Sequence, residues 1–451
     1  MTGLLAHAAP INYKFPLPIW LYVIAGGAAV LLSAPAAAFA VREAAPTERV
    51  GPDLYPTVRR LRLGPLLAIV GTLLIAVALA GGLFSTTQQS TEFFENPVTL
   101  LTWVDFWVGL GIVSWLVGNV WERVSPLNIA ARAVDRALAI REIQPLAYPA
   151  WLGQRPAVAL LLVWSWLELI WGPAKDPRTL ALLLVGYMIA TLAGSAVFGA
   201  EAWLGNVELF SVFARTLSRF SPLELRPFVP EEWASTDPSE RSARLRVYGA
   251  GLRTDPALPV GGSAFVLTTL ATVVFDGWSQ TDRFGSFQQW FYDRWSFLAQ
   301  HVGVLQTLSM LAVVGVFIAA YVAITRRNAS VLAVTLIPIA AVYFTAHYFA
   351  YLLIAGEDTP AVIVDPFGHS WNPLGWGEYG LWKGIAPAGL VWWLQVLVIV
   401  WGHVAAVFAA HRLALRTAGR VRALLAQVPL VALMVAYTVA GLWVLAQQLK
   451  A

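Results

Sequence analysis

The chain has 451 residues, of which 58% are apolar and 12% are charged, with a formal net charge of +4 and no cysteine. A soluble globular protein carries about twice that fraction of charged residues, so this composition excludes a water-soluble enzyme or nucleic-acid-binding module and indicates a multi-pass membrane protein. The lack of cysteine excludes disulfides, thiolate metal sites, iron–sulfur clusters and covalently attached c-type haem. Chemistry in this chain must therefore use histidine, acidic side chains or the backbone.

Ten apolar stretches predict ten membrane-spanning helices, because each is near the ~20 residues that cross ~30 Å of hydrocarbon. They cover 18–41, 64–84, 97–121, 156–172, 179–199, 262–280, 302–325, 329–356, 387–411 and 424–447. The first stretch lacks the basic n-region and short h-region of a cleavable signal, so we expect it to be retained. The predicted fold is all-α: a single polytopic transmembrane helix bundle of about ten spans over residues 1–451.

Basic residues are distributed unevenly between the connecting segments. Of the 30 Lys and Arg, 23 lie in the segments 42–63, 122–155, 200–261, 326–328 and 412–423. Basic residues near span ends stay on the cytoplasmic side, so these segments are predicted to be cytoplasmic. Both termini are then outside, as an even number of spans requires.

Two connecting segments are long enough to carry structure of their own. In the cytoplasmic loop 200–261, residues 203–220 place apolar side chains at helical spacing opposite Arg215 and Arg219. This pattern predicts either an interfacial helix on anionic lipid or a cap packed against the bundle. The outer loop 357–386 is rich in glycine, proline and aromatic residues, which is typical of an ordered lid. It either caps a site below it or seals the bundle.

Ionisable side chains inside the predicted spans are candidate functional residues, because burying such a group in hydrocarbon costs several kcal/mol unless it is paired or neutralised. The acidic ones are Asp105, Glu168 and Asp276, and His347 accompanies them. With 1.5 Å of rise per residue, all four lie roughly 8–14 Å below the outer ends of their helices. We therefore predict a shared polar layer in the outer leaflet, built from four helices.

Imidazole and carboxylates are the usual ligands of Zn, Fe, Mn or Cu in a helix bundle. His301, at the outer start of its span, and Asp365 or His369, in the lid-like loop, lie where they would complete such a set. The alternative is that each group is separately satisfied, for instance a carboxylate hydrogen-bonded to a tryptophan indole. No HExxH or ExxH pair decides between the two.

Three further polar residues lie along the ninth predicted span. Gln395, His403 and His411 follow one another at intervals of eight residues, each of which rotates a helix by about 80°. They predict a polar spiral suited to a proton path or a second site, although His411, beside Arg412, also suits the headgroup zone at a helix end. We expect no haem, which needs two axial histidines at matching depth on facing helices. We expect no nucleotide, because the chain has neither GxxxxGK[ST] nor GxGxxG.

Several stretches in a fixed order resemble one family of membrane proteins. They are FPLPIWLYVIAGGAAVLLS (15–33), TWVDFWVGL (102–110), GNVWERVSPLNIAAR (118–132), WSWLELIW (164–171), GSAVFGAEAWLGNVELFSVFARTLSRFSPLE (194–224), TLATVVFDGWSQTD (269–282), TAHYFAYLL (345–353), VDPFGHSWNPLG (364–375) and WWLQVLVIVWGHVAAVFAAHRLAL (392–415). Together they resemble the polytopic bacterial membrane proteins called fenitrothion hydrolase-like, and the likeness covers nearly the whole chain.

The resemblance implies a hydrolase of lipophilic, organophosphate-like esters in the cytoplasmic (inner) membrane of a bacterium. Its motif positions are Asp105, Glu168, Asp276, His347, His403 and His411. In this interpretation Asp276 and His347 bind the metal, and Asp105 or Glu168 is a further ligand or general base. The chain departs from the family at Pro10-Ile11, where relatives often begin with His-Gly, and at Arg412, where they carry an acidic residue.

Two other functions fit the same residues. The first alternative is a transporter of a metal ion or small solute, in which the outer carboxylates and histidine form the binding site. The second alternative is a non-catalytic membrane subunit of a larger respiratory or electron-transfer complex. For the hydrolase, the transporter and the complex subunit alike, we expect the lipid bilayer as the environment. For the complex subunit, we also expect other membrane subunits as partners. We expect no nucleic acid in any of the three cases.

Overall fold

The computed structural model of the chain describes residues 18–41, 51–85, 95–226, 237, 240–255, 257–373, 375, 387–415 and 420–448. Helices dominate these residues, so the predicted all-α fold is confirmed. The one sheet among them is a small antiparallel pair, β1 (Leu223–Arg226) and β2 (Ser242–Leu245), in which Leu223 is opposite Leu245. The Pro10-Ile11 region and residues 376–386 of the lid-like loop lie outside the described residues.

Eight helical segments are long and apolar enough to cross a bilayer. They are α1 (Ile19–Ala40), α3 (Leu63–Phe84), the segment Pro97–Leu116, α9 (Pro177–Phe198), α17 (Val302–Thr325), the segment Ala329–Val364, α21 (Ala388–Leu415) and α22 (Arg420–Gln448). The segment Pro97–Leu116 comprises α4 (Pro97–Leu100), the π-helix η3 (Leu101–Phe106) and α5 (Trp107–Leu116). The segment Ala329–Val364 contains α18 (Ala329–Ala333), α19 (Ile337–Ala355), the 3₁₀ turn η8 (Gly356–Asp358) and α20 (Thr359–Val364). The chain is thus an integral membrane protein.

Two of the ten predicted spans form helices that are not among these eight. Helix α8 (Arg155–Leu169) has 15 residues, and α14 (Gly262–Ser279) has 18 residues that include Asp276 and several threonines. The two helices pack against each other, and α14 also packs against α17, α19 and α22. They are therefore central to the bundle, and their crossing of the membrane stays a prediction.

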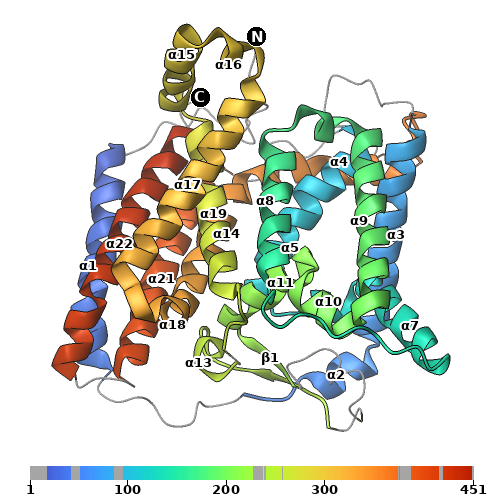
Figure 1. The fold of residues 1–451 in the computed structure, drawn as a ribbon, viewed down its shortest axis with the longest axis horizontal. Coiled ribbons are helices and arrows are strands. Elements are labelled where there is room, and N and C mark those ends of the chain that lie inside the picture. The colour runs from blue at the N-terminus through green and yellow to red at the C-terminus, as the bar shows by residue number, and fades with distance from the viewer. Residues whose placement is uncertain are drawn as a thin grey trace.

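The helices form two groups that meet along a central seam. Helices α1, α21 and α22 lie side by side at one edge, whereas α3 and α9 lie at the other (Figure 1). Helices α14 and α19 of the first group contact α8 and α5 of the second. The residues of the candidate site come from this seam.

The two ends of the bundle differ in composition. The end that carries α15 (Asp282–Arg294) and α16 (Ser296–Gln300) is where α1 begins and α22 ends (Figure 1). The opposite end carries α2 (Tyr55–Arg60), α7 (Pro126–Ile140), the β1–β2 pair and α13 (Gly251–Thr254). These elements belong to the arginine-rich segments, so this second end is the predicted cytoplasmic one.

The segment 203–220 does not lie on a lipid surface. It forms the end of α10 (Ala200–Asn206), then α11 (Leu209–Leu217) and the short turn η5 (Ser218–Phe220). Nearly every residue of α11 is buried, and the Phe213 ring packs against Trp107 of α5 and Phe344 of α19. The side chains of α5 and α19 thus cover the apolar face of α11, as the packed-cap alternative expects.

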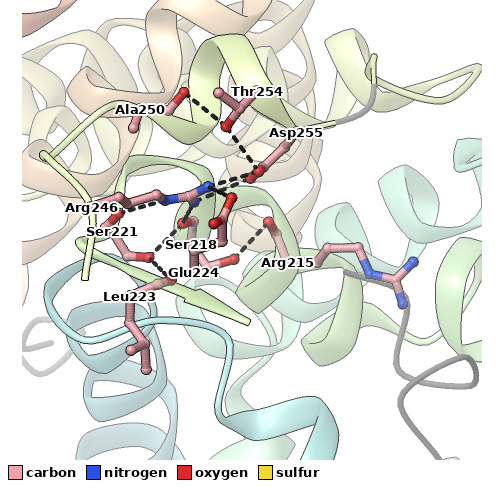
Figure 2. Close-up of polar contacts among 9 residues, drawn as sticks. All are labelled: Arg215, Ser218, Ser221, Leu223, Glu224, Arg246, Ala250, Thr254 and Asp255. Atoms are coloured by element: carbon pink, nitrogen blue, oxygen red, sulfur yellow. Dashed lines mark hydrogen bonds and ion pairs between the residues drawn. The ribbon is translucent and has the colours of Figure 1, made fainter. Parts of the chain in front are cut away.

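One of the two arginines expected to face lipid headgroups, Arg215, instead forms an ion pair with the buried Glu122. Arg215 lies 2.7 Å from Glu122. Arg246, on the strand side of the cluster in Figure 2, lies 2.8 Å from Asp255 and 3.6 Å from Glu224. Burial lowers the pKa of Arg219 to about 10, so this guanidinium is still charged at neutral pH. The network joins η5, the β1–β2 pair and α13 into one cap at the arginine-rich end of the bundle.

Candidate intramembrane site

Asp276 and His347 form the centre of the candidate site. Asp276 Oδ2 lies 2.7 Å from His347 Nε2, and both side chains are at most 2% exposed. The second carboxylate oxygen, Oδ1, accepts a 2.7 Å hydrogen bond from the side-chain amide of Gln280, the residue directly after α14. Two neighbouring groups therefore hold the Asp276 carboxylate in one orientation.

Gly277 allows three helices to meet at this pair. A Cβ atom at position 277 would lie 2.2 Å from Val444 Cγ1 of α22 and 3.3 Å from His347 Cε1 of α19. Small residues permit such close approach of helices in a membrane. The FDG sequence thus supplies both the carboxylate and the space in which the imidazole meets it.

Glu168 of α8 brings a second carboxylate to the pair. It is 5% exposed and interacts electrostatically with Asp276. The Tyr348 side chain, next to His347 on α19, is within hydrogen-bonding reach of both carboxylates. Three of the four residues predicted to share a layer are therefore in direct or near contact; the cluster of Glu168, Asp276 and His347 is called the outer cluster below.

Asp105 lies at the edge of the outer cluster. It sits in η3, and its Oδ2 accepts a 2.8 Å hydrogen bond from Thr359 at the start of α20. The buried Tyr351 interacts electrostatically with Asp105, Glu168 and Asp276, so it lies near both the outer cluster and Asp105. π-Helical turns occur often at functional sites, and nothing in the apolar pattern of 97–121 indicated this one.

Charge balance limits the states of the outer cluster. With a neutral imidazole and two ionised carboxylates, its net charge is −2. A net charge in a low-dielectric interior is disfavoured, and these three groups reach zero net charge only when they take up two protons in addition to the one on the neutral imidazole. Protonation of these groups reduces that charge.

The proposed metal ligands do not all converge. His301 is exposed, and its Nδ1 lies 3.0 Å from the Phe297 carbonyl oxygen. Among the described residues, no group of three or more His, Cys, Asp or Glu side chains is arranged to hold a metal ion. Both oxygens of Asp276 and the Nε2 of His347 are already engaged. As these side chains are placed, they do not fit the metal that the resemblance implies.

The lid residues occupy a turn of their own. Asp365 accepts hydrogen bonds from the backbone N–H groups of His369 and Ser370, at 2.9 and 2.6 Å. The neighbouring Pro366 carbonyl packs close to Gly81 of α3. His369 is exposed beside the rings of Phe367 and Trp371. Asp365 therefore stabilises the turn, which lies against α3.

The polar residues of α21 continue towards the arginine-rich end of the bundle, which is the predicted cytoplasmic end. The Gln395 amide donates a 2.7 Å hydrogen bond to the Ala346 carbonyl, directly before His347. His403 Nδ1 lies 2.8 Å from the Ile399 carbonyl, and His411 Nδ1 lies 3.0 Å from Gln427 Nε2 of α22. Both imidazoles are fully buried. His411 therefore packs against α22 inside the bundle.

Several site residues were missed by sequence reasoning. Gln280, Tyr348, Tyr351 and Thr359 carry no charge at neutral pH, so a search for ionisable groups in apolar spans passes over them. Gln280 had a usable signal, since it follows Asp276 by four residues and so shares its helix face. The tyrosines stand out only once the packing of α19 against α8 and α14 is known.

The fold and the site define the class: an integral membrane helix bundle with a buried histidine–carboxylate cluster at the seam of two helix groups. No family model, no curated protein and no solved structure matches the chain. The resemblance to the fenitrothion hydrolase-like proteins stays a prediction.

Proposed function

We propose that this protein moves protons across the membrane and that the outer cluster is its proton-binding site. The observation that carries the proposal is the direct Asp276–His347 contact beside a second buried carboxylate, Glu168. Charge balance favours the uptake of two protons by these three groups beyond the one on the neutral imidazole. Ionisable groups within membrane helices typically mark ion pathways and proton relays.

The geometry supports transfer as well as binding. A proton moves readily between two groups within hydrogen-bonding distance, and Asp276 Oδ2 and His347 Nε2 are 2.7 Å apart. Tyr348 reaches both carboxylates, so it bridges Asp276 to Glu168. Tyr351 extends the polar groups to Asp105, which is half-buried and forms the outermost member. Protons would enter from the outer side by this route.

The test is proton flux in liposomes that contain the purified protein and an internal pH dye, driven by a potassium diffusion potential. We expect acidification that depends on the protein and falls at least tenfold in Asp276→Asn and in His347→Gln. His301→Gln is the matched control, because His301 is exposed and outside the outer cluster. A wild-type protein that passes no more protons than empty liposomes would show that the proposal is wrong.

A second function has one observation in its favour. A carboxylate that orients an imidazole is also the arrangement with which hydrolases activate water, and Asp276–His347 has this arrangement. Hydrolysis of a lipophilic ester that enters from the lipid would then depend on the pair. Release of the phenol from an organophosphate triester by the detergent-purified protein, abolished in His347→Gln but unaffected in His301→Gln, would favour this function over proton movement.

A further inference from the structure

We propose that the arginine-rich end of α3 and α9 binds the headgroups of acidic phospholipids. The surface consists of the α2–α3 junction, residues 59–63, and the end of α7 with the chain that follows it, residues 136–146. It is called the headgroup surface below. It lies at the edge of the bundle opposite to α1, α21 and α22 (Figure 1), away from the outer cluster, so the proposal is independent of the proposed function.

Helix α3 meets lipid along most of its length. Of the eight apolar segments it has the highest mean hydropathy, 2.5, and the smallest buried share, 17%. Its 22 residues rise about 33 Å, slightly more than the ~30 Å of hydrocarbon in a bilayer. The residues directly before Leu63 therefore lie where the phospholipid headgroups begin.

Three arginines stand at this boundary. Arg59, Arg60 and Arg62 are all exposed, and Leu61 between them is 59% exposed. Arg62 has a left-handed backbone, with φ 51°, which turns the chain between the two helices. Helix α2 therefore lies across the end of the bundle while α3 runs through it (Figure 1). The turn places three guanidinium groups at the start of a lipid-facing helix.

Carboxylates at this end of the bundle are engaged with other groups. Glu122 forms its ion pair with Arg215. Asp53, the acidic residue nearest to the junction in the sequence, accepts hydrogen bonds from the backbone N–H groups of Tyr55 and Ala243. Within the described part of the chain, the positive charge of the junction thus faces outwards.

The chain that follows α7 reaches the same level beside α9. The Leu146 N–H donates a 2.7 Å hydrogen bond to the carbonyl oxygen of Val197, in the last turn of α9. Helix α7 itself packs against both α3 and α9. The side chains of Ile140, Ile143 and Leu146 are 84%, 49% and 64% exposed. Apolar side chains are therefore uncovered at the depth where a membrane helix ends.

Arginines accompany these apolar side chains. Arg136 and Arg141 are exposed, and Glu142 is the one acidic residue of the headgroup surface, against five arginines. Apolar side chains next to basic ones are typical of a segment that lies in the headgroup layer, where the former reach the acyl chains. Guanidinium groups bind phosphate through two parallel hydrogen bonds.

The charge of the headgroup surface selects between lipids. A zwitterionic phospholipid offers a phosphate together with its own ammonium group, which opposes the arginines. An acidic phospholipid offers a net negative charge, and each arginine near such a leaflet strengthens binding about fivefold. The partner that fits is therefore an acidic phospholipid.

The experiment measures which lipid gathers at the surface. Because the chain has no cysteine, Thr57→Cys on α2 places a single fluorophore beside the junction, and Ala299→Cys on α16 places one at the other end; both residues are exposed. The full-length protein is reconstituted in phosphatidylcholine vesicles with a minority of phosphatidylglycerol, and an energy acceptor is attached to one lipid or the other.

We expect energy transfer from position 57 to be at least about twofold greater to phosphatidylglycerol than to phosphatidylcholine, and equal for the two lipids from position 299. The excess should disappear when Arg59→Gln, Arg60→Gln and Arg62→Gln are combined. It should also fall in about 1 M salt, where charges are screened within about 3 Å. The matched control combines Arg178→Gln, Arg283→Gln and Arg294→Gln, three exposed arginines at the other end, and should keep the excess.

A lysine variant separates charge from local structure. Arg59→Lys, Arg60→Lys and Arg62→Lys together keep the positive charge and should keep most of the excess. A loss as large as that of the glutamine variant would trace the effect to the shape of the junction and overturn the proposal. Equal transfer to the two lipids from position 57 in the otherwise unchanged protein would overturn it directly.

Discussion

Asp276 of α14 and His347 of α19 are 71 positions apart in the chain, yet Oδ2 of the first lies 2.7 Å from Nε2 of the second inside the bundle. The contact joins two helices that also pack against α22 at the same level through Gly277. The Asp276–His347 contact therefore has two roles: it is a hydrogen-bonded pair of ionisable side chains, and it lies where the helices pack closely together. The predictions below separate these two roles.

The first prediction concerns coupling between the paired side chains. Removing one partner leaves the other buried and uncompensated, which costs about 3–5 kcal/mol in the free energy of unfolding when the pair is charged. We expect Asp276→Leu and His347→Leu each to destabilise the protein, and the double variant to cost at least 1 kcal/mol less than the sum of the two. Unfolding in detergent measures all three. Additive effects within about 0.5 kcal/mol would show that the two side chains are not energetically coupled.

The second prediction concerns Gly277. An alanine there places its Cβ 2.2 Å from Val444 Cγ1, so α14 and α22 must separate, at a cost of about 1–3 kcal/mol. Val444→Ala in the same chain should recover most of that loss. Gly186→Ala is the control, since nothing lies within 4 Å of the added atom on α9. Equal melting temperatures for Gly277→Ala and Gly186→Ala would contradict the close packing.

The third prediction is a pH dependence of stability at the base of α11. Glu208 is buried and accepts hydrogen bonds from the Tyr187 hydroxyl and from the backbone N–H groups of Phe210 and Ser211. Burial raises the pKa of Glu208 above the usual 4.5. The hydrogen bonds lower it, but by less than burial raises it. The folded protein therefore retains a proton that the unfolded chain has already lost.

The sign follows from that difference. The stabilising contribution of protonated Glu208 is complete below pH 4.5 and is lost as the pH rises through the raised pKa, by up to about 1.4 kcal/mol for each pH unit in the window. Unfolding measured at pH 5, 6, 7 and 8 should show this decline in the wild type, and Glu208→Gln should lack it. Parallel pH profiles for the two proteins would mean that Glu208 has the same pKa in both states.

The fourth prediction concerns metal content. Because His301 lies away from the Asp276–His347 pair and the donors of that pair are engaged with each other, we expect less than one Zn, Fe, Mn or Cu per chain after a chelator wash. Elemental analysis of the purified protein measures this directly. A stoichiometric metal that disappears in both Asp276→Asn and His347→Ala, but persists in His301→Gln, would instead support the hydrolase that the resemblance implies.

Part of the site followed from the sequence. The sequence predicts a similar depth below the outer helix ends for Asp105, Glu168, Asp276 and His347. That prediction uses the rise per residue of a helix and the uneven distribution of basic residues between the connecting segments, and both can be read from the chain without knowing which helices are neighbours. The assignment of His301 as a metal ligand stays a prediction, because its position at the start of α17 says nothing about the direction of its side chain. That side chain turns back to the carbonyl oxygen of Phe297 in its own segment.

The amphipathic pattern of 203–220 shows the same limit. The apolar residues on one face of α11 predict an apolar environment for that face, and the arginines on the other face predict polar or charged partners. They do not state whether lipid or protein supplies these environments. In the structure, protein supplies both environments. On the apolar face, the Phe213 ring packs against Trp107 and Phe344. On the other face, Arg215 forms an ion pair with Glu122.

Composition and apolar segment length alone determined that this chain is an all-α membrane protein, because every backbone hydrogen bond in hydrocarbon must be made within the segment and only a helix of sufficient length does so in isolation. Only the tertiary structure decided which buried polar groups meet. Helix neighbours in a bundle are selected by close packing at small residues such as Gly277, and those contacts join positions far apart in the chain that no local pattern connects. The outer cluster of Glu168, Asp276 and His347 exists because α8, α14 and α19 pack in this one arrangement.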